Sequence, residues 1–209
     1  MIGHARATGA LCGLAVLAIA ACGGTAPSRF YTLSSVPPAA PVVAPAATGQ
    51  GDQRLSTLLV GTIDLPQTLD RPQFVRRSGS NTVDIAELDR WSEPLDGMIR
   101  RCLADDLAAR LPRTRILTAE LPSVPIDNRL MLEIDRFEAD ESGRVRLNAQ
   151  WFVSSANAAA PRLSRRSTIE EHAAGRDTEA IVVAMSRALA TLSSEMADAL
   201  SALPPRASK

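Results

Sequence analysis

This chain of 209 residues has little lysine, few aromatic residues and no excess of either charge, and each of these lacks argues against a class of function. Lysine occurs once, at the last position, so there is no phosphate-binding glycine loop ending in Lys-Ser/Thr, and the chain is not expected to hydrolyse ATP. Aromatic residues make up only 3%, too few to predict stacking platforms for bases or sugars. Basic and acidic residues number 23 each, a balance that argues against a nucleic-acid partner.

Cysteine is the next rare residue, with three in the whole chain. One lies within an apolar N-terminal run and Cys22 ends that run, so only Cys102 remains in the body of the sequence. A single cysteine predicts neither a disulfide framework nor a cysteine metal site. Cys102 falls on the apolar side of a predicted helix, where we expect it to be buried.

Groups that would support catalysis are also missing from the sequence. His172 follows Glu170 and Glu171, but neighbouring residues of a strand point to opposite faces and no second histidine completes a metal site. No serine lies in a Gly-x-Ser-x-Gly turn. The sequence therefore predicts a protein that binds rather than catalyses, with no metal and no cofactor.

The N-terminus carries a targeting signal. After a weakly basic start, an apolar run of about a dozen residues ends in Ile19-Ala20-Ala21-Cys22, which resembles a bacterial lipobox. Residues 1–21 are then a signal peptide, and residues 22–29 form a lipidated N-terminus in which Cys22 carries the acyl chains of a stable anchor. No aspartate follows at the second position, which favours the periplasmic face of the outer membrane. The alternative is a cleaved secretory signal with a chance cysteine.

Residues 30–203 are predicted to form a single α+β domain. Strand-like runs at 30–33, 57–65, 73–76, 82–85, 115–118, 130–137, 144–154 and 163–171 predict a mostly antiparallel or mixed sheet of about five to seven strands. Apolar periodicity predicts two main helices, at about 95–111 and about 178–203, packed on one face of the sheet. The apolar residues of the second helix recur at spacings of three and four and form one stripe. This stripe fits either a helix that packs on a sheet or a coiled-coil contact.

Two segments are expected to lie outside this packed body. The Pro/Ala-rich residues 36–51 should be mobile, and they are either a tether to the lipid or a surface excursion between two strands. If residues 30–33 pair into the sheet, only the seven residues 23–29 separate lipid and domain, a reach of roughly 23 Å. Residues 204–209 are expected to form a disordered tail.

Residues 65–95 are dense in side chains that packing alone does not require. The candidates for partner binding are Asp70, Arg71, Pro72, Arg77, Arg90 and Trp91. Arginine presents a forked donor that suits partner carboxylates. Trp91 is either an interface anchor or a hydrophobic plug at the helix start. Asp70 and Arg71 either contact a partner or form a local ion pair.

These residues, with the lipobox, the Tyr31-Thr32-Leu33 strand and Val60-Gly61, resemble the PqiC-like family of ABC-type transport auxiliary lipoproteins. The resemblance implies an outer-membrane lipoprotein that acts without catalysis in lipid transport between the two membranes. It implies as partners an MCE-domain periplasmic protein with its inner-membrane permease system, besides the outer membrane that holds the anchor. A ring-shaped partner of this kind is compatible with a symmetric homo-oligomer.

Two other functions stay open at the level of sequence. The first is a structural lipoprotein of outer-membrane assembly or lipopolysaccharide export, which would bind other partners through the same surface. The second is a peripheral hydrolase, which would need a reactive serine.

Overall fold

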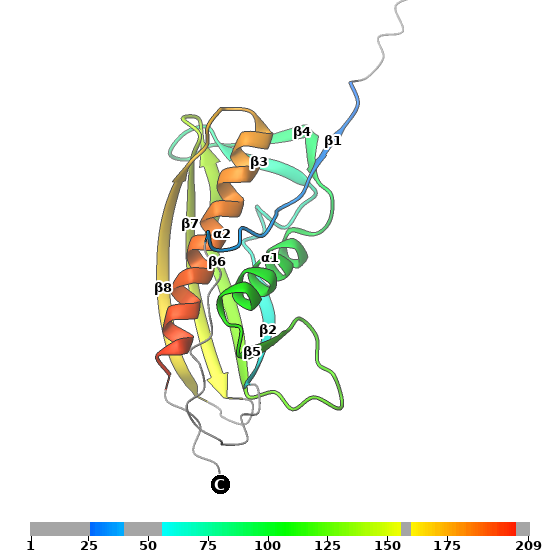
Figure 1. Ribbon diagram of the computed structural model, residues 1–209. Helices are drawn as coiled ribbons and strands as arrows, with labels where there is room; N and C mark the ends of the chain where they lie inside the picture. The colour runs from blue at the N-terminus through cyan, green and yellow to red at the C-terminus, as the bar shows by residue number, and fades with distance from the viewer. Residues whose placement is uncertain (1–25, 40–55, 156–159, 204–209) are drawn as a thin grey trace, which may run out of the picture.

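The computed structural model describes residues 26–39, 56–155 and 160–203 (Figure 1). The predicted signal peptide, Cys22 and the tail at 204–209 lie outside these residues, as does the Pro/Ala-rich segment beyond residue 39. The elements in chain order are β1 (Arg29–Tyr31), β2 (Ser56–Asp64), β3 (Gln73–Arg77), β4 (Val83–Trp91), α1 (Leu95–Arg110), β5 (Thr114–Leu117), β6 (Asn128–Asp140), β7 (Arg144–Ser155), β8 (Pro161–His172) and α2 (Thr178–Ser201).

The α+β class is confirmed: the described residues form one mixed sheet of eight strands with two helices. The helices lie side by side on one face of the sheet, as expected (Figure 1). Eight strands exceed the five to seven expected, because two short runs also pair. β1 has three residues and joins the edge of β4, and β5 has four and joins the edge of β2.

The long strand β6 organises the sheet. β7 pairs antiparallel with β6 along nearly its whole length. The other edge of β6 is shared by β2, which pairs with residues 128–133, and by β3, which pairs with residues 139–140; both run parallel to β6. The chain between them turns away after Pro66, whose carbonyl accepts hydrogen bonds from the amides of Leu69 and Asp70 at 2.8 and 3.2 Å. Residues 65–72 therefore form an excursion between two strands that lie in line.

The strands on either side of the Pro/Ala-rich segment belong to the same sheet. β1 precedes the segment and β2 follows it. In chain order the segment therefore connects two strands of one sheet, and beyond residue 39 it lies outside the described residues.

The two helices pack with the faces that the sequence predicts. α1 contacts β2 and β5, and α2 contacts β6, β7, β8 and α1. Asp177 caps α2 by accepting a hydrogen bond from the Ala180 amide at 2.9 Å. α2 is long and apolar enough to cross a membrane, but 67% of its apolar window is buried inside the domain, as in a core helix. The apolar stripe of α2 thus packs on the sheet.

Trp91 lies in the hydrophobic core. Its side chain is 5% exposed, and its ring packs on Phe74 with 5.1 Å between the ring centroids and an interplanar angle of 55°. This tilted contact is typical of favourable aromatic pairs. Of the two roles open to Trp91, the structure supports the hydrophobic plug. Phe30, two strands' width from Phe74, is by contrast 66% exposed.

We expect Trp91→Ala to lower the free energy of unfolding by about 3–5 kcal/mol, since it removes a buried indole and leaves a cavity against Phe74. Phe30→Ala serves as the matched aromatic control and should stay within about 0.5 kcal/mol of wild type. Urea unfolding followed by circular dichroism measures both. Equal small losses would contradict a core role for Trp91.

Candidate functional site

The motif from residue 65 to residue 95 separates into two surfaces. At one end of β3, Gln73 pairs with Arg90, and the Trp91 amide donates to the Pro72 carbonyl at 2.7 Å. This pairing brings together a set of exposed and half-buried residues that we call the entry patch: Asp70, Arg71, Pro72 and Arg90. Trp91 lies beneath the patch in the core and does not belong to it.

Arg71 is the least satisfied member of the entry patch. Its Nε atom is buried and has no hydrogen-bond partner within the described residues. The local ion pair between Asp70 and Arg71, one of the two alternatives, does not form in this part of the chain. Arg90 donates from Nε to the carbonyl of Glu87 at 3.3 Å, which fixes its stem. The patch thus presents two guanidinium groups that no carboxylate of the described residues neutralises.

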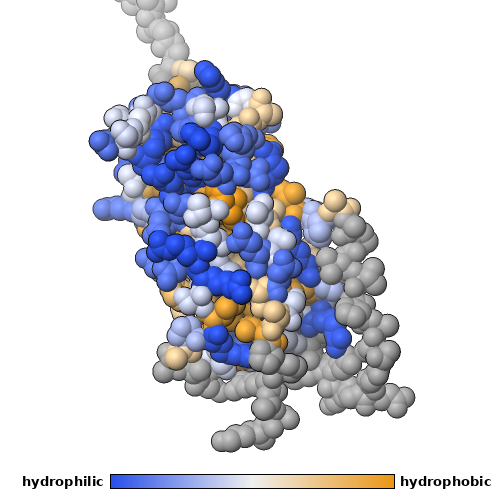
Figure 2. Space-filling view, turned by 90° about the vertical axis from the view of Figure 1, so that its left-hand side faces the viewer, coloured by the Kyte–Doolittle hydropathy of each residue, from blue (hydrophilic) through white to orange (hydrophobic). Residues whose placement is uncertain are grey.

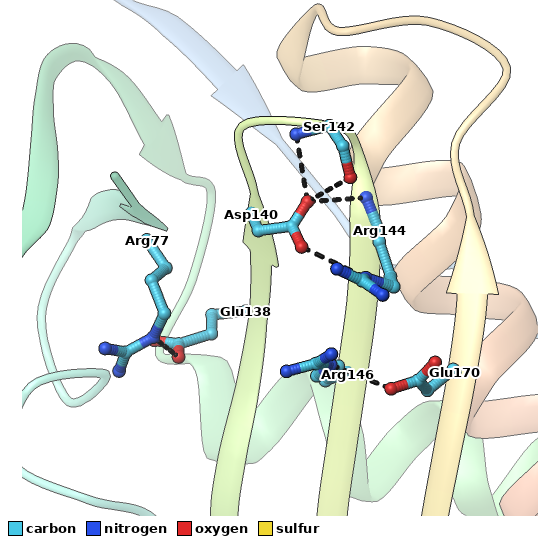
Figure 3. Close-up of polar contacts among 7 residues, drawn as sticks. All are labelled: Arg77, Glu138, Asp140, Ser142, Arg144, Arg146 and Glu170. Carbon is cyan, nitrogen blue, oxygen red and sulfur yellow. Dashed lines mark hydrogen bonds and ion pairs between the residues drawn. The ribbon is translucent and has the colours of Figure 1, made fainter. Parts of the chain in front are cut away.

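Arg77 lies apart from the entry patch, at the far end of β3, where it pairs in register with Asp140 of β6 and Val83 of β4. It helps to line a hollow of about 380 Å³ on the sheet face opposite the helices (Figure 3). We call this cavity the arginine hollow. Its charged lining includes Arg77, Arg136, Glu138, Asp140, Arg144 and Arg146.

Glu138 holds two arginines of the hollow. The glutamate is 8% exposed, and its Oε1 atom accepts from Arg77 Nε at 2.5 Å and lies 3.3 Å from Arg136 Nε. Arg146 on the next strand pairs through Nε with Glu170 of β8 at 2.8 Å. Alternation along β7 places Arg144 and Arg146 on the face opposite its buried residues. Glu138 and Asp140 lie beyond residue 137, where the preceding strand is predicted to end, whereas β6 runs on to Asp140. Arg136 lies within the predicted strand, but no local pattern singles it out as a site residue.

Asp140 organises the turn between β6 and β7. Its Oδ1 accepts from the amide and the hydroxyl of Ser142 at 2.9 and 2.5 Å and from the Arg144 amide at 3.2 Å, and its Oδ2 lies 3.1 Å from Arg144 Nε. Burial raises the pKa of Asp140, but the donors of Ser142 and Arg144 outweigh burial and hold it at about 2. Gly143 completes the turn with φ of +82°, a conformation that favours glycine.

The N-terminal strand is tied to the body by a second buried carboxylate. Asp89 of β4 accepts from Arg29 Nε at 2.8 Å and from the hydroxyl of Thr178, the first residue of α2. Arg76 in turn donates to the Thr178 hydroxyl at 2.6 Å. Burial raises the pKa of Asp89, but the hydrogen bonds from Thr178 and Arg29 outweigh it and keep the pKa below its ordinary value.

After β1 the chain forms a strap over the two helices. Leu33 enters the core, and the Ser34 amide donates to Ser186 of α2 at 3.2 Å. The Val36 amide donates to Oδ1 of the fully buried Asp106 on α1 at 2.8 Å. Burial raises the pKa of Asp106, although the Val36 amide and Arg110 partly offset this. The N-terminal segment is therefore bonded to both helices as well as to the sheet.

The N-terminus and the arginine hollow lie at the same end of the sheet. β1 runs parallel to β4, and the start of β4 pairs with Arg77 at the end of β3. In Figure 1 the described chain before Arg29 leaves at the same end of the sheet as the turns that flank the hollow, but on the opposite side of the sheet. With about 3.3 Å per residue, the seven residues after Cys22 reach roughly 23 Å.

The Glu-Glu-His run does not converge on a metal. Glu170 reaches Arg146 on the outer face, whereas Glu171 pairs with Arg187 of α2 at 3.2 Å on the other face. Within the described residues, no group of three or more His, Cys, Asp and Glu side chains is placed to hold a metal ion.

The chain is similar in sequence to one known family and in fold to solved structures. The model of the family described as "ABC-type transport auxiliary lipoprotein component" matches residues 31–197. Two solved structures share the fold. One, titled only as an uncharacterized protein, has a TM-score of 0.68 at 18% identity over 83% of this chain and 99% of its own. The other, a Xanthomonas campestris protein of family DUF330, has a TM-score of 0.65 at 17% identity over 81% and 93%. A search of curated proteins found no significant match.

The pKa of Asp140 makes stability depend on pH. Its folded pKa of about 2 lies below the ordinary 3.8, so its contribution is complete above about pH 5 and is lost as pH falls toward 2. We expect Asp140→Asn to cost about 1–2 kcal/mol at pH 7, and the difference from wild type to shrink between pH 5 and pH 3.

Urea unfolding across this pH range tests the prediction. Glu141→Gln is the control, since Glu141 is an exposed neighbour in the same turn and should leave the stability unchanged at every pH. A penalty for Asp140→Asn that is independent of pH would mean that the charge of Asp140 does not stabilise the turn.

Proposed function

Since the chain belongs to the family of ABC-type transport auxiliary lipoprotein components, we propose that it is a non-catalytic docking subunit anchored at the periplasmic face of the outer membrane. In this proposal, Cys22 carries the lipid anchor. The domain binds an MCE-domain protein that works with an inner-membrane permease to carry lipid between the two membranes. The protein thus supplies location and contact, while its partners move the lipid.

The observation that carries the proposal is the continuity between the anchor and the folded body. Six residues lie between Cys22 and Arg29, and β1 is bonded into the sheet and to α2 through Asp89. The strap then bonds Val36 to α1. A spacer of roughly 23 Å that ends in a rigid attachment keeps the domain against the membrane, as expected of a docking subunit.

The entry patch is the proposed contact surface for the partner. Arg71 and Arg90 offer guanidinium donors that no carboxylate of the described residues neutralises. Forked donors of this kind recognise carboxylates with defined geometry. We therefore expect the partner to present acidic side chains to this patch.

The chemistry of the remaining thiol supports a binding role. Cys102 is buried and unpaired, and burial raises the pKa of its thiol to about 11. A thiol with this pKa is almost fully protonated at neutral pH, and only the thiolate is a competent nucleophile. Cys102 is therefore a packing residue of α1.

The anchor is tested by Cys22→Ala. We expect this variant to lose acyl labelling with radioactive palmitate and to leave the outer-membrane fraction of a sucrose gradient, whereas Cys102→Ala keeps both. Labelling that persists in Cys22→Ala would contradict the assignment of the anchor. A wild-type protein in the inner-membrane fraction would contradict the proposed location.

The docking role is tested by co-purification from detergent extracts at native expression. Wild type should capture an MCE-domain protein, and the double variant Arg71→Glu/Arg90→Glu should capture at least about tenfold less, because two donors become repulsive charges. Arg115→Glu, a charge reversal at an exposed residue of β5 away from the patch, should capture within about twofold of wild type.

Two results would overturn the proposal. One is the failure of wild-type protein to capture any MCE-domain protein. The other is capture of components of outer-membrane assembly or lipopolysaccharide export instead, which would establish the alternative structural role.

A further inference from the structure

The arginines of the arginine hollow share one mode of attachment. Arg136 approaches Glu138, Arg144 approaches Asp140 and Arg146 approaches Glu170, in each case through Nε. The three distances are 3.3, 3.1 and 2.8 Å. A guanidinium held at Nε is fixed in direction, while its two terminal amino groups stay available for a second partner.

Those terminal groups have no partner inside the domain. Within the described residues, Nη1 and Nη2 of Arg136, Arg144 and Arg146 make no hydrogen bond. Arg77 differs, because its Nη1 donates to the Ser80 carbonyl at 3.0 Å. Three oriented guanidinium groups from two neighbouring strands therefore line one cavity of about 380 Å³; Figure 3 shows those of Arg144 and Arg146.

Each arginine of the hollow has a carboxylate beside it, but the carboxylates do not reach every donor. Four guanidinium groups face four carboxylates, those of Glu138, Asp140 and Glu141 in the lining and that of Glu170, which holds Arg146 from β8. Asp140 already accepts four hydrogen bonds from its own turn, and Glu138 is shared between two arginines. The carboxylates thus orient the arginines without satisfying all of their donors.

We propose that the arginine hollow binds an oxyanion of the phosphate type. A phosphate group has several oxygens that accept hydrogen bonds in different directions, so it suits forks arriving from separate strands. A charge-assisted hydrogen bond of this kind is stronger than a neutral one. The volume of the hollow is sufficient for a phosphate with a small substituent.

The position of the hollow limits where the phosphate comes from. The hollow lies at the end of the sheet from which the N-terminal chain leaves, and this end is densely hydrophilic in Figure 2. An anchor with a short spacer would hold this end near the membrane surface, where lipid headgroups carry phosphates. Free phosphate of the surrounding solution has the same chemistry, so the experiment separates the two sources.

The test uses the full-length lipidated protein in a non-ionic detergent and isothermal titration calorimetry. One arm titrates inorganic phosphate and a second titrates dihexanoyl-phosphatidylglycerol at equal ionic strength. A third arm titrates a short polyglutamate peptide, which offers carboxylates alone. Binding in the second arm at least about tenfold tighter than in the first identifies a lipid headgroup, and similar affinities identify free phosphate.

Variants of Arg136 and Arg146 test whether their guanidinium groups bind the phosphate. Arg136→Gln/Arg146→Gln should weaken phosphate binding by about tenfold or more, because two charge-assisted contacts are lost. Arg136→Lys/Arg146→Lys keeps the charge but removes the forks, and it should weaken binding by a smaller factor. Arg115→Gln, at the opposite end of the sheet, removes one charge and should bind as wild type does. Circular dichroism confirms that each variant is folded.

Three results would overturn the assignment. They are no binding of either phosphate compound to wild type, unchanged binding in the double Gln variant, and preference for the carboxylate peptide, which would mark a protein-binding surface instead. The inference is independent of the docking role: loss of partner capture with intact phosphate binding rejects only the proposed function, and the reverse rejects only the phosphate site.

Discussion

The shared edge of β6 is the constraint on which the rest of the structure depends. Two strands, β2 and β3, pair in line with the same edge, and β7 covers the other. The chain must therefore leave the sheet between β2 and β3 and return to it, and this excursion carries Asp70 and Arg71. The end of β6 beyond β2 has only β3 and β7 beside it, which places Arg77 next to Glu138 and Asp140. Both candidate surfaces follow from one pairing arrangement.

Two buried carboxylates attach the N-terminus to this sheet. Asp89 binds Arg29 and Thr178, and Asp106 accepts the Val36 amide, so the segment that follows the proposed anchor contacts β4, α2 and α1 in turn. A buried carboxylate is costly unless it is hydrogen-bonded; Asp89 accepts hydrogen bonds on both of its oxygens, and Asp106 accepts one on Oδ1. These contacts fix residues 29–36 on the body of the domain.

The near absence of lysine has a structural counterpart in how the arginines are used. On the outer face of β6 and β7, carboxylates hold guanidinium groups at Nε and leave their terminal amino groups directed elsewhere. A lysine ammonium has no such division between an attached nitrogen and a free fork. The same side chains therefore stabilise the sheet and line a cavity suited to an anion. The helix face, by contrast, is a continuous apolar core, which leaves binding to the outer face and the strand ends.

Much of the fold follows from the sequence alone. Apolar and polar residues alternate along β7, and apolar residues recur with a 3.6-residue period along the helices. These patterns determine which faces are buried, because apolar side chains avoid water regardless of the order in which the strands pair. Local pattern also revealed the motif that contains Arg71 and Arg90. It did not reveal that β6 extends to Asp140, that Trp91 is buried against Phe74, or that Arg77 belongs to a different surface from Arg71. These outcomes depend on pairing between residues far apart in the chain, and only the tertiary structure decides which strand lies beside which.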